Sequence, residues 1–344
     1  MRVVAAALLA LTLAACAGTQ GVALEGGAAY DLSEEFARPG MPAPHVFVMR
    51  KGESTIAVFG TTHLVPERLQ WVSSATAAAL ARADVILTET SMFRRADVEV
   101  SAREAEDLKR RARQPEGASL WAAAAARLGP ERALALQALL TANELDPARY
   151  DRLRPWLLCR DLQIPPKLRT TLTDEDRAMI EELGATFEPP DLAPPDMKIE
   201  LYGESNGIQT MFLESEYDRA LNFSRLDDAA AFDCAAATLA RTKADGEPKP
   251  SVAKLYGMLL DLWLSGDIET ARGMIERDQT ALSPGWSRLF LQAREAAWLP
   301  RIAETCDAGR VNCFVAVGMA HLGGADGLLK GLERMGYVRV QPEG

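Results

Sequence analysis

Histidine is scarce in this chain, which has only three among its 344 residues: His45, His63 and His321. No two of them are close enough for H-E-x-x-H, in which two histidines one helical turn apart bind zinc. The sequence also lacks a phosphate-binding G-x-x-x-x-G-K-[ST] loop and a G-x-G-x-x-G turn. These absences exclude that helical zinc motif and leave nucleotide-dependent chemistry without support.

Basic residues are outnumbered, because 38 lysines and arginines face 48 aspartates and glutamates, which gives a formal net charge of −10. No clustered basic stripe stands out against this acidic balance. Proteins that bind nucleic acid usually carry a basic face. Nucleic acid is therefore not an expected partner.

Long apolar runs are absent except near the N-terminus, where residues 3–13 follow Arg2. At about 1.5 Å per helical residue this run is too short to cross a bilayer core of about 30 Å. It ends in Leu13-Ala14-Ala15-Cys16, the small-residue pattern after which lipoprotein signal peptides are cut. We therefore expect residues 1–15 to be a signal peptide and Cys16 to be the lipidated mature N-terminus. A plain secretory signal with an incidental cysteine is the alternative.

Lipidation of Cys16 would hold the protein to a membrane without a spanning helix. The expected location is the cell envelope, facing the periplasm. Gly18 stands where an aspartate would signal retention, which favours the outer membrane. We therefore expect the membrane to be a partner that the protein contacts only through its N-terminal lipid.

Four further cysteines remain in an oxidising compartment, and none forms C-x-x-C. They are Cys159, Cys234, Cys306 and Cys313. Cys306 and Cys313 flank a short turn between an expected helix end and an expected strand, so a local disulfide is plausible. Two half-buried free thiols remain the alternative.

Regular structure is expected from about residue 43, after a flexible tether over residues 16–42. One large domain then covers residues 43–341, and its middle, about 103–186, is rich in Ala, Leu and Arg at helical spacing. We predict an α/β (α+β) fold with a central mixed β-sheet built from N- and C-terminal segments, flanked by helices, with a largely helical middle insertion. Strands are expected over residues 45–50, 55–59, 84–88, 208–213, 312–317 and 337–340, and helices over 67–82, 215–221, 227–243, 251–263, 283–305 and 325–335.

Two of the three histidines share one local pattern: an apolar strand, a glycine, two residues and a histidine. Gly60 leads to His63 in this way, and Gly318 leads to His321. A glycine permits backbone conformations closed to other residues, so we expect the chain to turn sharply there and to aim each imidazole over the end of the sheet. We predict that Gly60 and Gly318 shape a cofactor site. The alternative is that each histidine merely packs below a loop.

A carboxylate is expected at the same sheet end, because Glu89 directly follows the apolar run at residues 84–88. A buried acid in that position is costly unless it is paired or bound. His63, His321 and Glu89 would suit a divalent metal ion such as Zn, Mn or Co. Glu89 would either ligate the ion or act as a general base toward its water. The alternative is a carboxylate that caps the next turn.

Arg294 and Trp298 lie one turn apart on an expected helix and therefore face the same way. Arg294 could stabilise negative charge that develops in a reaction, or form a structural ion pair with an acid such as Glu214. Glu214 ends its strand as Glu89 does, and is a secondary site candidate. His45 is expected to be a surface or core residue rather than a ligand.

The G-x-S-x-G pattern at residues 203–207 is set aside as a nucleophile motif. That motif needs a strand before the serine and a helix after it. In this sequence the expected strand follows. Ser205 is therefore not a predicted nucleophile.

Taken together, these motifs resemble the TraB/GumN family, and the Tiki metalloproteases are similar. The resemblance rests on both glycine-to-histidine motifs, on Glu89, on the helix with Trp298-Leu299-Pro300-Arg301 and on the closing Gly336-Tyr337-Val338, and it spans about residues 44–341. It implies a fold shared with erythromycin esterase and with the haem-binding lipoprotein ChaN. This chain departs from the family at Glu295, where an asparagine often follows the helix arginine.

We therefore expect a divalent-metal-dependent hydrolase, acting on a peptide or an ester at the cell envelope. Its predicted site comprises His63, His321 and Glu89, with Arg294 as a catalytic residue. The rival hypothesis is a non-catalytic lipoprotein that binds haem, iron or a peptide.

Overall fold

The computed structural model describes residues 32–38, 41–62, 65, 69–91, 101–143, 145–163, 194–242, 250–307 and 311–342. The predicted signal peptide, Cys16 and His63 lie outside these residues. Within them, no helix is both long and apolar enough to cross a membrane.

A six-stranded mixed sheet forms the centre of the domain, with strand order β4-β3-β5-β2-β1-β6. The four strands β4, β3, β5 and β2 run parallel, and β1 is antiparallel to both β2 and β6. The strands are β1 (Val46–Lys51), β2 (Ser54–Thr61), β3 (Val85–Thr88), β4 (Gln209–Phe212), β5 (Asn312–Gly318) and β6 (Val338–Val340). Segments from near both ends of the sequence thus meet in one sheet, as predicted.

Alternate side chains of the central strands point to opposite faces, and both faces are buried. Phe59 of β2 and Phe314 of β5 pack on one face, while Val58 and Val315 pack on the other. This two-sided burial explains why these strands read as continuous apolar runs in the sequence.

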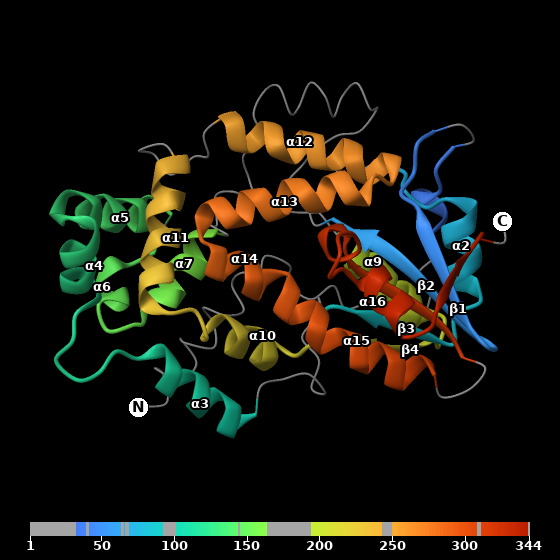
Figure 1. Ribbon diagram of the computed structural model, residues 1–344, viewed down its shortest axis with the longest axis horizontal. Helices are drawn as coiled ribbons and strands as arrows, with labels where there is room; N and C mark the ends of the chain where they lie inside the picture. Colours follow the sequence, from blue (N-terminus) through green and yellow to red (C-terminus); the bar gives the residue numbers. More distant parts are fainter. Residues whose placement is uncertain are drawn as a thin grey trace.

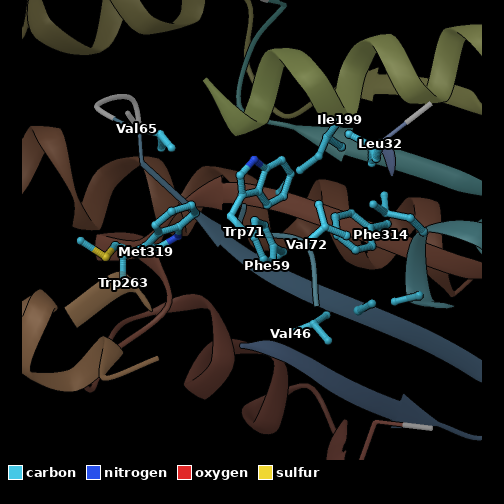
Figure 2. Packing of buried hydrophobic residues seen from close by; sticks show 14 of the residues in the cluster. Leu32, Val46, Phe59, Val65, Trp71, Val72, Ile199, Trp263, Phe314 and Met319 are labelled. Carbon is cyan, nitrogen blue, oxygen red and sulfur yellow. The ribbon is translucent and has the colours of Figure 1, made fainter. Parts of the chain in front are cut away.

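The first face is covered by α2 (Ser74–Ala81), α9 (Pro195–Ser205) and α12 (Pro250–Ser265). Figure 2 shows the aromatic side chains at its centre. The rings of Phe59, Trp71 and Trp263 pack as a triangle. The ring centroid of Phe59 lies 5.5 Å from that of Trp71 and 6.5 Å from that of Trp263, and the two tryptophan centroids are 6.3 Å apart. The indole of Trp263 also donates a 2.6 Å hydrogen bond to the carbonyl of Gly60, which fixes the end of β2.

The second face is covered by α15 (Gln292–Cys306) and α16 (Leu328–Arg334). Trp298 and Ile302 of α15 are fully buried against this face. Because α15 crosses the sheet here, side chains near its N-terminal end reach the carboxyl ends of the parallel strands.

The remaining helices form a lobe beside the sheet, on the left in Figure 1. Its two apolar clusters unite the predicted helical insertion with helices from later in the chain. Helix α13, and α14 followed by α15, run from this lobe to the sheet. The lobe helices are α3 (Ala102–Ala112), α4 (Leu120–Leu128), α5 (Pro130–Ala142), α6 (Pro147–Tyr150), α7 (Pro155–Gln163), α10 (Glu216–Phe223), α11 (Asp228–Arg241), α13 (Ile268–Leu282) and α14 (Pro284–Phe290).

Three features of the fold differ from the sequence-based expectation. The helix predicted over residues 67–82 begins only at Ser74, because the Ser73 side chain caps it by accepting from the Thr76 N–H. The helix predicted over residues 283–305 is two helices, since Leu291 ends α14 and precedes α15. Helix α13 was not predicted.

The segment predicted to be a tether contributes to the packed domain. Leu32 is buried in the cluster on the first face, and residues 33–35 form a short 3-10 helix. Glu35 pairs with Lys198 of α9. Ordered packing therefore starts N-terminal to residue 43.

All four cysteines among the described residues are in disulfides. Cys306 is joined to Cys313, which confirms the local disulfide and not the pair of free thiols. Cys159 of α7 is joined to Cys234 of α11, a bridge within the helical lobe.

Candidate functional site

The carboxyl ends of the parallel strands bring several predicted residues to one edge of the sheet. Glu89 follows β3, and Glu214 lies just beyond β4. The ladder between these strands continues past their ends, because the Glu214 N–H donates to the Glu89 carbonyl at 2.9 Å. The two carboxylates are thus fixed beside each other by backbone pairing.

The two glycine-to-histidine motifs begin on neighbouring strands. In the parallel pairing of β2 with β5, Gly60 is opposite Val317 and Thr61 is opposite Gly318. After Gly318, the 3-10 helix η3 (Met319–His321) carries His321 over the strand ends. The first motif can be followed only to Thr62, because His63 lies outside the described residues.

The predicted reason for the two glycines is wrong. Neither Gly60 nor Gly318 has a positive φ. Space is the constraint instead: a Cβ on Gly60 would lie 2.9 Å from the Cβ of Met319, and one on Gly318 would lie 3.1 Å from Oε1 of Glu89. Glycine is needed here so that β2, η3 and Glu89 can approach closely.

Arg294 of α15 stands at the centre of the site. Its Nη2 donates to Oε2 of Glu89 at 2.5 Å, and its Nε donates to Oε1 of Glu214 at 3.0 Å. Its Nη1 lies 3.2 Å from Nε2 of His321. The ion pair with Glu214 considered from the sequence is present, and it is part of a larger network.

Aromatic rings enclose the guanidinium of Arg294. Its Cζ lies 4.5 Å from the ring centroid of Trp298 and 5.9 Å from that of Phe290. Burial opposes the positive charge, but the carboxylates of Glu89 and Glu214 outweigh this effect and raise the pKa of Arg294 above its ordinary value. The guanidinium is therefore a permanent cation in a nearly dry environment.

The helix that carries Arg294 also fixes Glu214. The indole N–H of Trp298 lies 3.3 Å from Oε2 of Glu214, and Arg301 donates to the Leu213 carbonyl. The predicted helix motif around Trp298 thus secures the carboxylate at the end of β4.

The contacts of His321 define its tautomer. A guanidinium can only donate hydrogen bonds, so Nε2 of His321 must accept from Arg294. Nδ1 lies 3.0 Å from Oε1 of Glu295 and therefore carries the proton that it donates there. His321 is consequently a neutral imidazole whose Nε2 lone pair faces the cluster of Arg294 and Glu89.

Glu295 and Arg272 form a second layer behind His321. Arg272 of α13 pairs with Glu295, and both side chains are at most 3% exposed. Arg272 also donates to the carbonyl of Ala320 at 2.7 Å, next to His321. The sequence flagged Glu295 as a departure from the family pattern, but no signal indicated Arg272.

The structure brings together Glu89, Glu214, Arg294 and His321, all nine-tenths or more buried. It does not bring in His45, which is exposed and packs its ring edge-on against Phe47 at 6.4 Å between centroids. Phe290, whose ring stacks near His321 at 6.3 Å, was not predicted.

The described residues fit a metal ion only in part. Glu89 Oε1 and His321 Nε2 lie 3.9 Å apart. A neutral imidazole whose Nδ1–H is held by a carboxylate is the usual state of a metal-ligating histidine, which favours His321. However, Arg294 bonds to both candidate ligands, and within the described ranges no group of three or more His, Cys, Asp or Glu could hold a metal. A metal site would therefore need a further ligand, and the sequence predicts His63 for that role.

Comparison with known proteins gives one result. A sequence model of the TraB/PrgY/gumN family matches residues 46–340, which includes all six strands and every residue of the site. No curated protein and no solved structure matches the chain.

Proposed function

This chain belongs to the TraB/PrgY/gumN family, and we propose that it is a hydrolase of the cell envelope that cleaves a peptide or an ester with a divalent metal ion. The observation that carries the proposal is the state of His321. Its Nδ1–H is held by Glu295, and its unprotonated Nε2 accepts from Arg294 and lies 3.9 Å from Oε1 of Glu89. A fixed, neutral imidazole beside a carboxylate is suited to binding a metal ion or to accepting a proton.

His321, Glu89 and the predicted ligand His63 would hold the ion. When bound, a zinc, manganese or cobalt ion supplies polarisation of a carbonyl and of a water molecule. The alternative role for Glu89 is that of a general base, which would receive the proton of the attacking water on a carboxylate oxygen.

The other residues orient and stabilise. Arg294 is the cation in contact with both Glu89 and His321, so it would stabilise negative charge that develops on a carbonyl oxygen. Arg294 and His321 are 6% and 2% exposed, and such burial strengthens every electrostatic contact in the site. Glu295 would keep the Nδ1–H tautomer throughout.

Single substitutions separate these roles. His321→Ala removes a ligand and should abolish both metal content and hydrolysis of a panel of peptides and esters, whereas exposed His45→Ala should change neither. Glu89→Gln should slow hydrolysis by about 10² to 10⁴-fold with metal retained if Glu89 is the base. If Glu89 is a ligand, the same change should also reduce metal content. Wild-type protein that takes up no transition metal on dialysis would refute the metal-dependent proposal.

A second candidate function is favoured by the ion pairs of Arg294, which give both Glu89 and Glu214 a cationic partner within the protein. In that case the protein would be a non-catalytic lipoprotein that binds haem, iron or a peptide. A Soret band on addition of haem, without turnover of any panel substrate, would support this candidate over the hydrolase.

The location at the envelope is part of the proposal and rests on the sequence at Leu13-Ala14-Ala15-Cys16. A lipidated Cys16 would anchor the protein, with the outer membrane favoured. Cys16→Ser should therefore move the protein from the membrane fraction to the soluble fraction. Unchanged partitioning would contradict the anchor.

A further inference from the structure

A basic groove lies on the helical lobe, where the end of α3 meets the segment before α7. Its volume is about 540 Å³. Five of the eight side chains that line it are basic and one is acidic. The lining residues are Glu106, Lys109, Arg110, Arg111, Arg113, Gln114, Pro115 and Arg154. None of the residues of the Glu89–His321 site lines this groove.

Backbone pairing builds the groove. Arg113 and Leu153 form an isolated antiparallel bridge between the end of α3 and the approach to α7. Two hydrogen bonds flank it: the Arg154 N–H donates to Ala112 O at 2.7 Å, and the Gln114 N–H donates to Arg152 O at 2.9 Å. Arg113 and Arg154, which are far apart in the sequence, are thereby fixed on one groove.

The positive charge of the groove is only partly compensated. Four ion pairs compensate part of it. Lys109 pairs with Glu106, Arg110 and Arg111 each pair with Asp107, and Arg154 pairs with Asp228. Arg113 has no ion-pair partner among the residues that the structure describes.

Like charges one helical turn apart repel, and Lys109 and Arg113 are so spaced. The dipole of α3 favours the basic residues of its last turn, but it does not account for Arg154, which belongs to another segment. The run Lys109-Arg110-Arg111-Ala112-Arg113 contradicts the expectation that no basic residues cluster, and the whole-chain charge of −10 conceals it.

We propose that this groove binds a phosphate-bearing group. Four of its basic residues are arginines, whose planar fork matches phosphate oxygens two at a time. A second hollow of about 380 Å³ shares Arg154 and adds Arg225, but Asp227 and Asp228 also line it, so the excess of basic side chains is confined to the first groove. The phosphate could come from an anionic lipid headgroup or from a soluble phosphate ester.

Titration of the full chain with inorganic phosphate and with pyrophosphate, followed by calorimetry at low salt, tests the site. Arg113→Glu should weaken binding at least tenfold. Arg113 is exposed and makes no ion pair among the described residues, so the substitution should leave the fold intact. The control is Arg132→Glu, the same charge reversal at an exposed position on α5 outside the groove lining.

Vesicles then distinguish the two sources. If phosphatidylglycerol vesicles retain the wild-type chain more than phosphatidylcholine vesicles do, and Arg113→Glu removes that difference, the ligand is a lipid headgroup. If Arg113→Glu weakens phosphate binding without changing retention on vesicles, the ligand is a soluble phosphate ester. If Arg113→Glu and Arg132→Glu bind phosphate and both vesicle types as the wild type does, the proposal is wrong.

Discussion

A buried pair of opposite charges, Arg272 and Glu295, positions the one described histidine of the site. Both are almost fully buried, and Glu295 is shared between Arg272 and Nδ1 of His321. A buried charge that loses its partner is far more costly than an exposed one. The stability of the site is therefore sensitive to either member of this pair.

We expect Arg272→Met to lower the free energy of unfolding by about 3–5 kcal/mol, because Glu295 would be left buried without its main partner. Urea denaturation measures the change. Arg127→Met is the control, since Arg127 pairs with Asp233 on the surface and its loss should cost at most about 1 kcal/mol. Equal losses in the two variants would contradict a critical buried pair.

Which residues belong to the site could be predicted from the sequence where they follow an apolar strand. Glu89, Glu214 and His321 were found in this way, because strand ends collect at one edge of a sheet. Arg272 could not be found, since it lies in the middle of a helix and only the packing of α13 against η3 brings it to Ala320. The place of His63 in the site stays a prediction.

At the scale of elements, the close approach of β2, β5 and η3 decides what the site tolerates. A Cβ on Gly60 would lie 2.9 Å from the Cβ of Met319, and one on Gly318 would lie 3.1 Å from Oε1 of Glu89, so a side chain at either position would have to displace a neighbour. Their positions are therefore determined by packing and not by backbone conformation.

Gly60→Ala should destabilise the protein by about 1–3 kcal/mol, because the new methyl would meet both Cβ and Cα of Met319. Gly318→Ala should mainly displace the Glu89 carboxylate, and should reduce the proposed hydrolysis more than stability. Thermal unfolding and substrate assays give the two readouts. Gly273→Ala in α13 is the matched control, since its methyl has room and should stabilise the helix by up to about 1 kcal/mol. Similar losses in all three variants would rule out the packing argument.

Most strands were predictable because they are short, apolar and bounded by turn residues. Helix boundaries were less so: residues 69–73 continue the apolar pattern, but Trp71 and Val72 pair with the segment at Glu35 and Phe36 instead of entering α2. A long-range contact of this kind leaves no local trace in the sequence.

At the scale of the whole molecule, two disulfides tie separate parts of the chain. One closes a separation of 75 residues inside the helical lobe, and the other closes a separation of seven between α15 and β5. The entropy that a disulfide removes from the unfolded chain grows with the length of the loop it closes.

Replacing Cys159 and Cys234 by alanine should therefore cost more stability than replacing Cys306 and Cys313. Loop entropy gives about 4.5 kcal/mol for the first pair and about 2.4 kcal/mol for the second. Guanidinium unfolding of each double variant measures both losses. A larger loss for the short-range pair would show that native contacts, and not unfolded-state entropy, determine the effect.

The pairing of Cys159 with Cys234 and the strand order could not be read from the sequence. Four cysteines allow three pairings, and spacing favoured only the local one. Likewise, the apolar pattern of residues 312–317 predicts a buried strand but does not place it between β3 and β2.

That central place of β5 sets the timing of folding during synthesis. A ribosome has made β1, β2 and β3 once it reaches Thr88, but the strand that separates β2 from β3 begins more than two hundred residues later, at Asn312. Until then the nascent chain cannot complete its sheet, and β2 and β3 lack the strand with which both of them pair. The edge of the sheet that carries Glu89 and His321 is therefore complete only once β5, near the end of the chain, has been made.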